Sequence, residues 1–223
     1  MNQLCEIKNW GKLVAAVLTS IPPTTVDAVF IFNRNDLQLE LLARAASLYS
    51  EMLPFSSRII INGLRKYEAV YGSWGSTEWR SILEEHGVPP EHLLAIEPAG
   101  HSGEEAEKFV GLCSQYGWRN VIVMAPPYYL PRCFLNMLGV SIEQGVDLNI
   151  SCLTVPNIRW EEYATKHAVR GGVVVQGMRF DHLDDELDRI VDYRTRYEKR
   201  EDGISAIASI MEGVGYLRER LLT

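Results

Sequence analysis

The chain has 223 residues, enough for one large domain, and 47% of them are hydrophobic, which excludes disorder of the whole chain. Its formal net charge of −7 provides no general positive field, so we expect neither nucleic acid nor a membrane surface as a partner. The 4 cysteines contain no C-x-x-C pair, which predicts reduced, mostly buried thiols and no structural zinc. We find no signal peptide and no run of about 18 apolar residues, and therefore expect a cytoplasmic protein.

The first two thirds of the chain alternate between helical and strand patterns. Residues 4–20 carry apolar side chains at helical spacing, and consecutive prolines end that segment. Residues 26–32 form a short apolar, β-branched run, typical of a parallel strand buried on both faces. Further helices are predicted at 37–52, 76–86, 104–116 and 132–144, and further strands at 58–62, 93–97, 120–124 and 148–153. This alternation predicts a three-layer α/β fold with a doubly wound, mostly parallel, Rossmann-like sheet.

The remainder of the chain, residues 156–223, predicts a helical extension of the same single domain. Residues 171–175 predict a sixth strand at the sheet edge, and 184–200 a highly charged helix. A last helix is predicted at 203–222, with one apolar stripe. The stripe consists of Ile204, Ile207, Met211, Val214, Leu217 and Leu221. It either packs on the domain, which we favour, or forms a homodimer interface.

Ligands of open α/β sheets bind beyond the carboxyl ends of the strands, which directs attention to the loops there. The first such loop contains Asn33, Arg34 and Asn35 and lacks G-x-G-x-x-G, so the common dinucleotide-binding fingerprint is absent. The chain also contains no G-x-x-x-x-G-K-[ST] and no G-x-S-x-G. These absences argue against a P-loop NTPase and an ordinary α/β-hydrolase.

The second loop begins at Gly63 and ends where Ser76, Thr77 and Glu78 start a helix. Hydroxyl and small residues at a helix start can hold an anion through exposed backbone N–H groups. An ordinary helix cap, with Glu78 complementing the helix dipole, explains the same residues. Residues 72–75 (Gly-Ser-Trp-Gly) belong to this loop as well.

The third loop places Glu97 and His101 before a predicted helix. Ser102 and Glu105 have the spacing of a capping box, with Ser102 as the cap. His101 is either a general acid or base titrating near neutrality, or a solvated loop residue.

The fourth loop contains Tyr128, Tyr129 and Arg132. Two aromatic rings and a guanidinium can stack on a base and hold a phosphate or carboxylate, although a packed turn with a surface arginine fits equally well. The acidic residues between 181 and 188 lack the ordered spacing of a calcium loop. We interpret them as an acid-rich helix start and predict no metal.

Several short motifs occur in one order along the chain. They are 27–29 (Asp-Ala-Val), Arg44, 59–63 (Ile-Ile-Ile-Asn-Gly), 77–78 (Thr-Glu), 87–89 (Gly-Val-Pro), Glu97, Ser102, Glu105 and 126–132. Together they resemble the ElyC/SanA/YdcF family of bacterial proteins, which have a Rossmann-like domain. The family-like core spans about 26–155. The resemblance implies a small anionic or nucleoside-like ligand, with S-adenosylmethionine as a possible cofactor.

The chain also departs from that family at several positions. Asn33 and Arg34 replace a glycine-rich first loop, and Tyr129, Pro126 and Glu105 stand where the family has His, Ser and Asn. These changes leave open whether the site is catalytic.

We therefore expect an enzyme, hydrolase or transferase, acting on a small phosphate-bearing or nucleoside-like molecule. The expected catalytic residues are Glu78, Glu97 and His101. The expected ligand-binding residues are Asn33, Arg34, Arg44, Gly63, Ser76, Thr77, Ser102, Tyr128, Tyr129 and Arg132. The alternatives are a catalytically degenerate ligand-binding or regulatory protein on the same scaffold, and an assembly subunit that pairs through its last helix.

Overall fold

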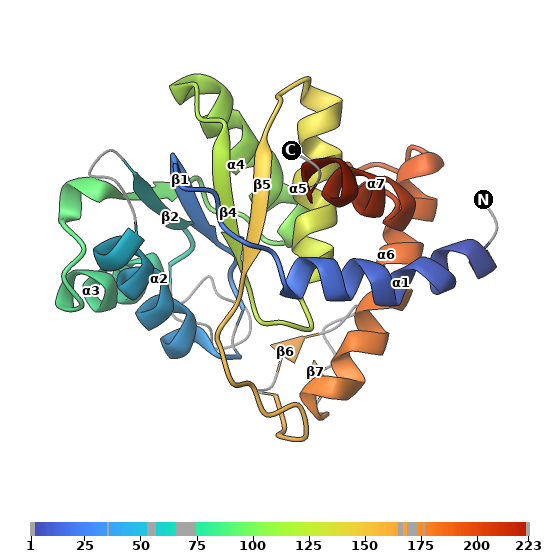
Figure 1. Cartoon of the computed structure of the whole chain (residues 1–223), viewed down its shortest axis with the longest axis horizontal. Coiled ribbons are helices and arrows are strands. Elements are labelled where there is room, and N and C mark those ends of the chain that lie inside the picture. The colour runs from blue at the N-terminus through green and yellow to red at the C-terminus, as the bar shows by residue number, and fades with distance from the viewer. Residues whose placement is uncertain are drawn as a thin grey trace.

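The computed structural model describes residues 3–34, 36–52, 57–65, 75–164, 167–168, 174–175 and 177–221. Its centre is a five-stranded, entirely parallel sheet with strand order β3-β2-β1-β4-β5 (Figure 1). The strands are β1 (Ala28–Ile31), β2 (Arg58–Asn62), β3 (Leu93–Ile96), β4 (Asn120–Met124) and β5 (Asn149–Leu153). This arrangement confirms the predicted doubly wound, Rossmann-like sheet.

Helices cover both faces of the sheet and complete three layers (Figure 1). One face carries α2 (Gln38–Met52) and α3 (Ser76–Glu85). The other carries α1 (Gln3–Leu18), α4 (Ser102–Tyr116), α5 (Leu130–Gln144) and α7 (Ile210–Leu221). A short 3₁₀ turn, η1 (Pro90–His92), precedes β3.

Successive residues of a strand point to opposite faces of the sheet, and β1 shows how this divides the core. Val29 and Ile31 pack with α2 and α3, whereas Phe30 and Phe32 pack with α4 and α5. All four side chains are completely buried. Burial of one such side chain contributes roughly 1.5–3 kcal/mol, so the apolar run predicted at this position anchors both layers.

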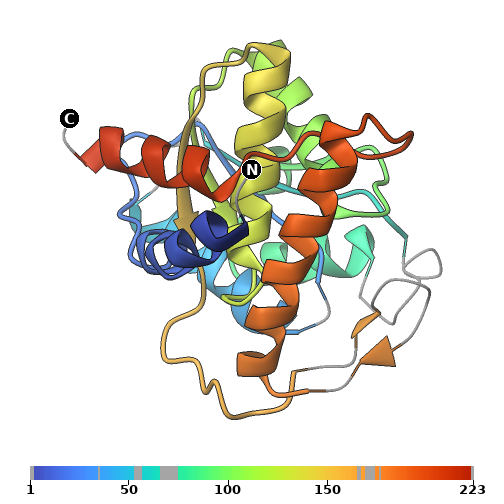
Figure 2. The same cartoon turned by 90° about the vertical axis from the view of Figure 1, so that its right-hand side faces the viewer.

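Helix α6 (Arg179–Glu198) lies outside this three-layer arrangement, alongside α5 on the side away from the sheet (Figure 2). It buries one narrow face, which consists of Arg179, His182, Glu186 and Ile190. Because three of these four residues are polar, the contact is not an ordinary apolar helix interface.

The sixth predicted strand is not part of the main sheet. Val174–Val175 forms β7, which pairs antiparallel with β6 (His167–Ala168) in a separate two-stranded sheet. Residues 171–173 lie outside the described residues.

The last helix was predicted too long, because it begins at Ile210 and not at 203. Ser209 is its cap: Glu212 N donates to Ser209 Oγ at 3.2 Å, and Ser209 N donates to the Glu212 carboxylate at 2.7 Å. This capping box stops the helix from extending towards the N-terminus. The preceding segment packs on α5, where Ala208 N donates to Leu135 O at 3.0 Å.

The apolar stripe of α7 packs mainly within the chain. Ile207, Val214 and Leu217 are buried in the core shared with α1 and α5, while Met211 is exposed. The favoured expectation, packing on the domain, agrees with this burial, and the alternative of a homodimer interface loses most of the surface on which it was based. No helix in the described part of the chain combines the length and apolarity needed to cross a membrane.

Candidate functional site

The chain reverses its winding direction between β1 and β4, which are neighbours in the sheet although far apart in sequence. Crevices at such points are the usual ligand sites of open α/β sheets. The loop after β1 contributes Arg34, and the loop after β4 contributes Tyr129 and Arg132. Both guanidiniums lie over the Tyr129 ring, whose centre is 4.3 Å from Arg34 Cζ and 4.7 Å from Arg132 Cζ. The structure thus brings together residues that were predicted from two separate loops.

A carboxylate from the C-terminal extension completes this group. Glu186 Oε1 lies 3.2 Å from Arg34 Nη2 and 2.9 Å from Arg189 Nη1, and Oε2 lies 2.5 Å from Arg132 Nε. The Glu186 side chain is only 1% exposed and that of Arg132 5%. We call Arg34, Arg132, Arg189 and Glu186 the arginine cluster.

Electrostatics in the arginine cluster favour the charged forms. Burial alone would raise the pKa of Glu186, but Arg132, Arg34 and Arg189 outweigh it and hold that pKa below its usual value. Burial disfavours the guanidinium of Arg132 as well, but Glu186 keeps its pKa above the ordinary value. The site therefore contains more buried positive than negative charge, which is suited to an additional anion.

A second buried carboxyl group, Glu105, lies at the same edge of the sheet. Its Oε1 accepts hydrogen bonds from Asn33 N at 3.0 Å and from Asn62 Nδ2 at 2.9 Å. Burial raises the pKa of Glu105 to about 7, while the two hydrogen bonds and Arg34 and Arg132 partly oppose this shift. A carboxyl group with this pKa can both donate and accept a proton near neutral pH.

Two buried polar atoms of the first loop lack a hydrogen bond within the described residues: Asn33 Oδ1 and Arg34 Nε. Leaving such a group unpaired costs about 1–3 kcal/mol, and most buried polar groups are paired. The two residues are those that also contact the buried carboxyl groups, Asn33 through its backbone N to Glu105 and Arg34 through Nη2 to Glu186. We regard this as local evidence for a polar ligand.

The start of α6 is fixed to the loop after β1. Arg179 binds Asp36 in a bidentate manner, with Nε–Oδ2 at 2.9 Å and Nη2–Oδ1 at 3.2 Å. It also contacts the Glu162 carboxylate at 3.0 Å. Bidentate arginine–carboxylate pairs are strong and geometrically specific, so this contact positions Glu186 over the two arginines.

Three predicted site residues lie in the layer on the opposite face from α4 and α5. Arg44 is half-buried on α2, Glu78 is half-buried on α3, and Thr77 is exposed at the start of α3. Ser76 Oγ contacts Gly63 O at 3.5 Å. At Gly63 a Cβ would lie 2.2 Å from Ile96 O, which gives this glycine a packing role. Residue 35 and residues 72–74 of the predicted loops lie outside the described residues.

The predicted capping box of α4 is displaced by one residue. The cap is His101, whose Nδ1 accepts from Glu104 N at 3.2 Å, and Gly100 N donates to Glu104 Oε2 at 2.7 Å. Ser102 is instead the first helical residue, and its Oγ accepts from Asn136 Nδ2 at 2.8 Å. His101 and Glu97 are both exposed.

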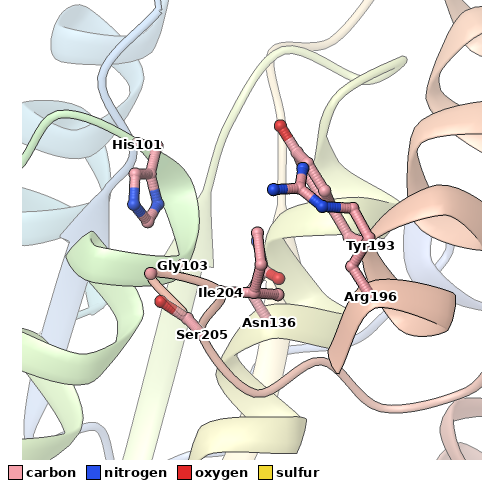
Figure 3. A pocket seen from close by; sticks show the side chains of 8 residues that line it. His101, Gly103, Asn136, Tyr193, Arg196, Ile204 and Ser205 are labelled. Carbon is pink, nitrogen blue, oxygen red and sulfur yellow. The ribbon is translucent and has the colours of Figure 1, made fainter. Parts of the chain in front are cut away.

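A pocket of about 200 Å³ lies near the arginine cluster. Figure 3 shows the side chains that line this pocket. The pocket lies between the start of α4, the middle of α5, the second half of α6 and the loop at 203–205. His101, Asn136 and Tyr193 line it. Tyr193 also contacts the cluster, since its ring centre lies 5.5 Å from Arg132 Cζ.

Sequence reasoning missed Glu186 and the role of Glu105. Glu186 was assigned to an acid-rich helix start, and Glu105 to a helix cap. The available signal was helical spacing: Glu186 lies between His182 and Ile190 on one face of α6, and Glu105 lies between Ser102 and Phe109 on the buried face of α4. A carboxylate on a buried face needs a partner, which would have directed attention to the arginines.

Within the described residues, no group of three or more His, Cys, Asp or Glu side chains is arranged to hold a metal ion. The groups available for a ligand are thus guanidinium, carboxyl, amide and aromatic side chains. No protein-family model matches the chain, and no curated protein matches it either.

Proposed function

We infer that this protein is an enzyme acting on a small molecule with a phosphate or carboxylate group, bound at the carboxyl ends of β1 and β4. The observation that carries the proposal is the pair of guanidiniums, Arg34 and Arg132, that converge beside the Tyr129 ring at the switch point of the sheet. Arginine is the preferred residue for planar recognition of phosphate and carboxylate groups. We propose hydrolase or transferase chemistry, in which an anion held this way is common.

In this proposal each residue has a distinct role. Arg34 and Arg132 hold the anionic group, and the Tyr129 ring, over which both guanidiniums lie, helps to position them. Glu105 moves the proton, because its pKa of about 7 supports both protonation states near neutrality. A positioned general acid or base contributes about 10²–10⁴-fold to a rate. Glu105 thereby takes the role that the sequence assigned to Glu78, Glu97 or His101.

One observation favours a second candidate, a ligand-binding or regulatory protein without turnover. Glu186 already neutralises part of the arginine cluster from within the chain. A ligand must share the arginines with this carboxylate, which weakens binding but does not prevent a regulatory response.

The wider expectations belong to the same proposal. The resemblance to the ElyC/SanA/YdcF family supports a nucleoside-like ligand, including S-adenosylmethionine. The location at the switch point of the sheet suits both a nucleoside-like ligand and a small phosphate- or carboxylate-bearing molecule. We propose a cytoplasmic location, supported by Cys113, Cys133 and Cys152, which are buried free thiols.

The test is a thermal-shift screen of phosphate, sugar phosphates, nucleotides and S-adenosylmethionine, followed by mass spectrometry for products. We expect at least one anionic compound to raise Tm, since a ligand at 100 times its Kd stabilises the folded state by about 2.7 kcal/mol. Arg132→Gln should weaken its binding about 10–100-fold through loss of a charge-assisted contact. The matched control is Arg119→Gln, at an exposed arginine before β4.

The possible outcomes separate the candidates. Product formation that depends on Glu105 supports the enzyme, whereas stabilisation without product supports the regulatory protein. Equal binding by Arg132→Gln and Arg119→Gln would refute the anion site itself.

A further inference from the structure

The pocket of Figure 3 and the arginine cluster share helices α5 and α6, and α4 carries a pocket residue close to the buried Glu105. On α5, Asn136 of the pocket follows Arg132 by four positions. On α6, Tyr193 follows Arg189 by the same spacing, and at the start of α4, His101 precedes Glu105 by the same spacing. Residues spaced in this way lie on one helix face, about 5.4 Å apart. Tyr193 links the two regions, because it lines the pocket and its ring centre lies 5.5 Å from Arg132 Cζ.

The pocket wall carries little net charge. Arg196 is the charged residue that lines it, and its guanidinium lies 2.8 Å from the Glu201 carboxylate and 3.8 Å from that of Asp192. Asn136 and Tyr193 supply uncharged polar groups. An anionic group is consequently favoured in the arginine cluster, and an uncharged polar group in the pocket.

The His101 side chain has a defined hydrogen-bonding direction. Its Nδ1 accepts the amide hydrogen of Glu104, which requires the proton of the neutral ring to be on Nε2. Nε2 is thus a hydrogen-bond donor on a ring that lines the pocket. The ring lies across the opening from Tyr193 (Figure 3). Two flat side chains on opposite sides are suited to a ring-shaped group.

One side of the pocket is formed by a close contact between Gly103 and Ser205 that only glycine allows. A Cβ at Gly103 would lie 2.6 Å from Ser205 Cβ and 2.7 Å from its Oγ. The loop at 203–205 therefore rests directly on the first turn of α4. This contact joins the C-terminal extension to the start of α4 and forms the floor of the pocket in Figure 3.

We propose that this pocket holds the uncharged, ring-shaped part of the ligand whose anionic group is held by Arg34 and Arg132. The ligand class is thus a ring compound, sugar or heterocycle, that carries a phosphate or carboxylate group a few bonds away. This inference rests on the proposed function, because it uses the same anion site. It adds the pocket, and its residues His101, Asn136 and Tyr193, as the part of the site that distinguishes a ring compound from a bare anion.

The experiment compares three probes by calorimetry on the full chain: inorganic phosphate, glucose 6-phosphate and adenosine 5′-monophosphate. We expect at least one ring compound to bind about tenfold or more tightly than phosphate. Ser205→Met places a larger side chain in the pocket and leaves less room for a ring. It should therefore remove the tighter binding of the ring compound relative to phosphate, while the affinity for phosphate itself stays within about twofold of wild type. Ser114→Met, at an exposed position of α4, is the matched control.

A second variant avoids dependence on the loop. His101→Asn retains a good helix cap but removes the ring and its Nε2 donor. This variant should reduce the ratio of the affinity for the ring compound to that for phosphate about 5–10-fold. The control His86→Asn, at an exposed histidine after α3, should leave this ratio unchanged.

Three results distinguish the two proposals. If both ring compounds bind no more tightly than phosphate, or if Ser205→Met and His101→Asn both leave their advantage intact, the pocket assignment is refuted. If Arg132→Gln leaves phosphate affinity unchanged, the anion site and with it the proposed function fail. The selective effect of the pocket variants on one ring compound supports the inference and identifies whether the ring is a sugar or a heterocycle.

Discussion

The buried carboxyl group of Glu105 should make the stability of this protein depend on pH in an unusual direction. Its pKa is about 7 in the folded protein, against 4.5 for the unperturbed side chain. The folded state therefore binds this proton more tightly than the unfolded state does. The corresponding stabilisation is fully present below pH 4.5 and is lost as the pH rises through about 7.

The size of the effect follows from the shift. The difference between 4.5 and about 7 corresponds to about 3.5 kcal/mol for complete titration, at about 1.4 kcal/mol for each pKa unit, and most of it falls between about pH 5 and about pH 8. Glu105→Gln should abolish this part of the pH dependence, because the amide cannot ionise and its oxygen still accepts from Asn33 N and Asn62 Nδ2. Relative to wild type, the variant should gain about 3 kcal/mol between about pH 5 and about pH 8.

Urea unfolding followed by tryptophan fluorescence measures both free energies of unfolding. Glu107→Gln, at a half-buried glutamate on the same helix, is the control and should follow the wild type. A constant difference between Glu105→Gln and wild type at the two pH values would refute the assignment of a neutral, buried carboxyl group. The same reasoning predicts that phosphate binds less tightly above about pH 7 in wild type but not in Glu105→Gln, because an ionised Glu105 repels the anion.

Two further changes test how the arginine cluster and the C-terminal extension are held. Glu186→Gln should cost about 3–5 kcal/mol in urea unfolding, because it leaves buried guanidiniums without their carboxylate, and added phosphate should recover part of the loss; no loss would mean that the cluster is not formed. Gly139→Ala should lower the free energy of unfolding by more than about 2 kcal/mol, because its Cβ would lie 2.5 Å from Ala208 N. The control Gly111→Ala, whose Cβ would have nothing within 4 Å, should raise the free energy of unfolding by about 0.5–1 kcal/mol. Equal effects of the two variants would contradict the packing of the extension on α5.

The sheet could be predicted because most of its strands have a continuous apolar centre with clear ends. The strands at 58–62 and 120–124 agree with the structure at both bounds. The segment before α7 was misassigned for a related reason. Residues 206–210 are all buried, so they look like part of an apolar helix face, although the chain there is extended until Ser209 caps α7. Local hydrophobicity does not distinguish these two conformations.

The site was predictable only where it depends on strand order. Arg34 and Arg132 follow strands that end at the same edge of the sheet, and the switch-point rule places such loops together. Glu186 comes from the distant C-terminal extension, 152 positions after Arg34, and no local pattern states which surface α6 covers. Arg44 was included because of a family resemblance, and Glu78 because it starts a helix after the second strand and also fits that resemblance. The structure places both on the opposite face from α4 and α5.

The arginine cluster is difficult to explain by stability alone. Two buried guanidiniums and a buried carboxylate must be removed from water, and replacing such groups with apolar residues of similar volume is often neutral or stabilising. The neighbouring Glu105 is held at a pKa of about 7 in the same region, and Arg34 Nε and Asn33 Oδ1 lack hydrogen bonds within the described residues. An apolar core would avoid each of these costs. Their joint presence at the switch point of the sheet is therefore best explained by a preorganised site for an anionic ligand. In this site the Glu186 carboxylate partly neutralises the arginines from within the chain.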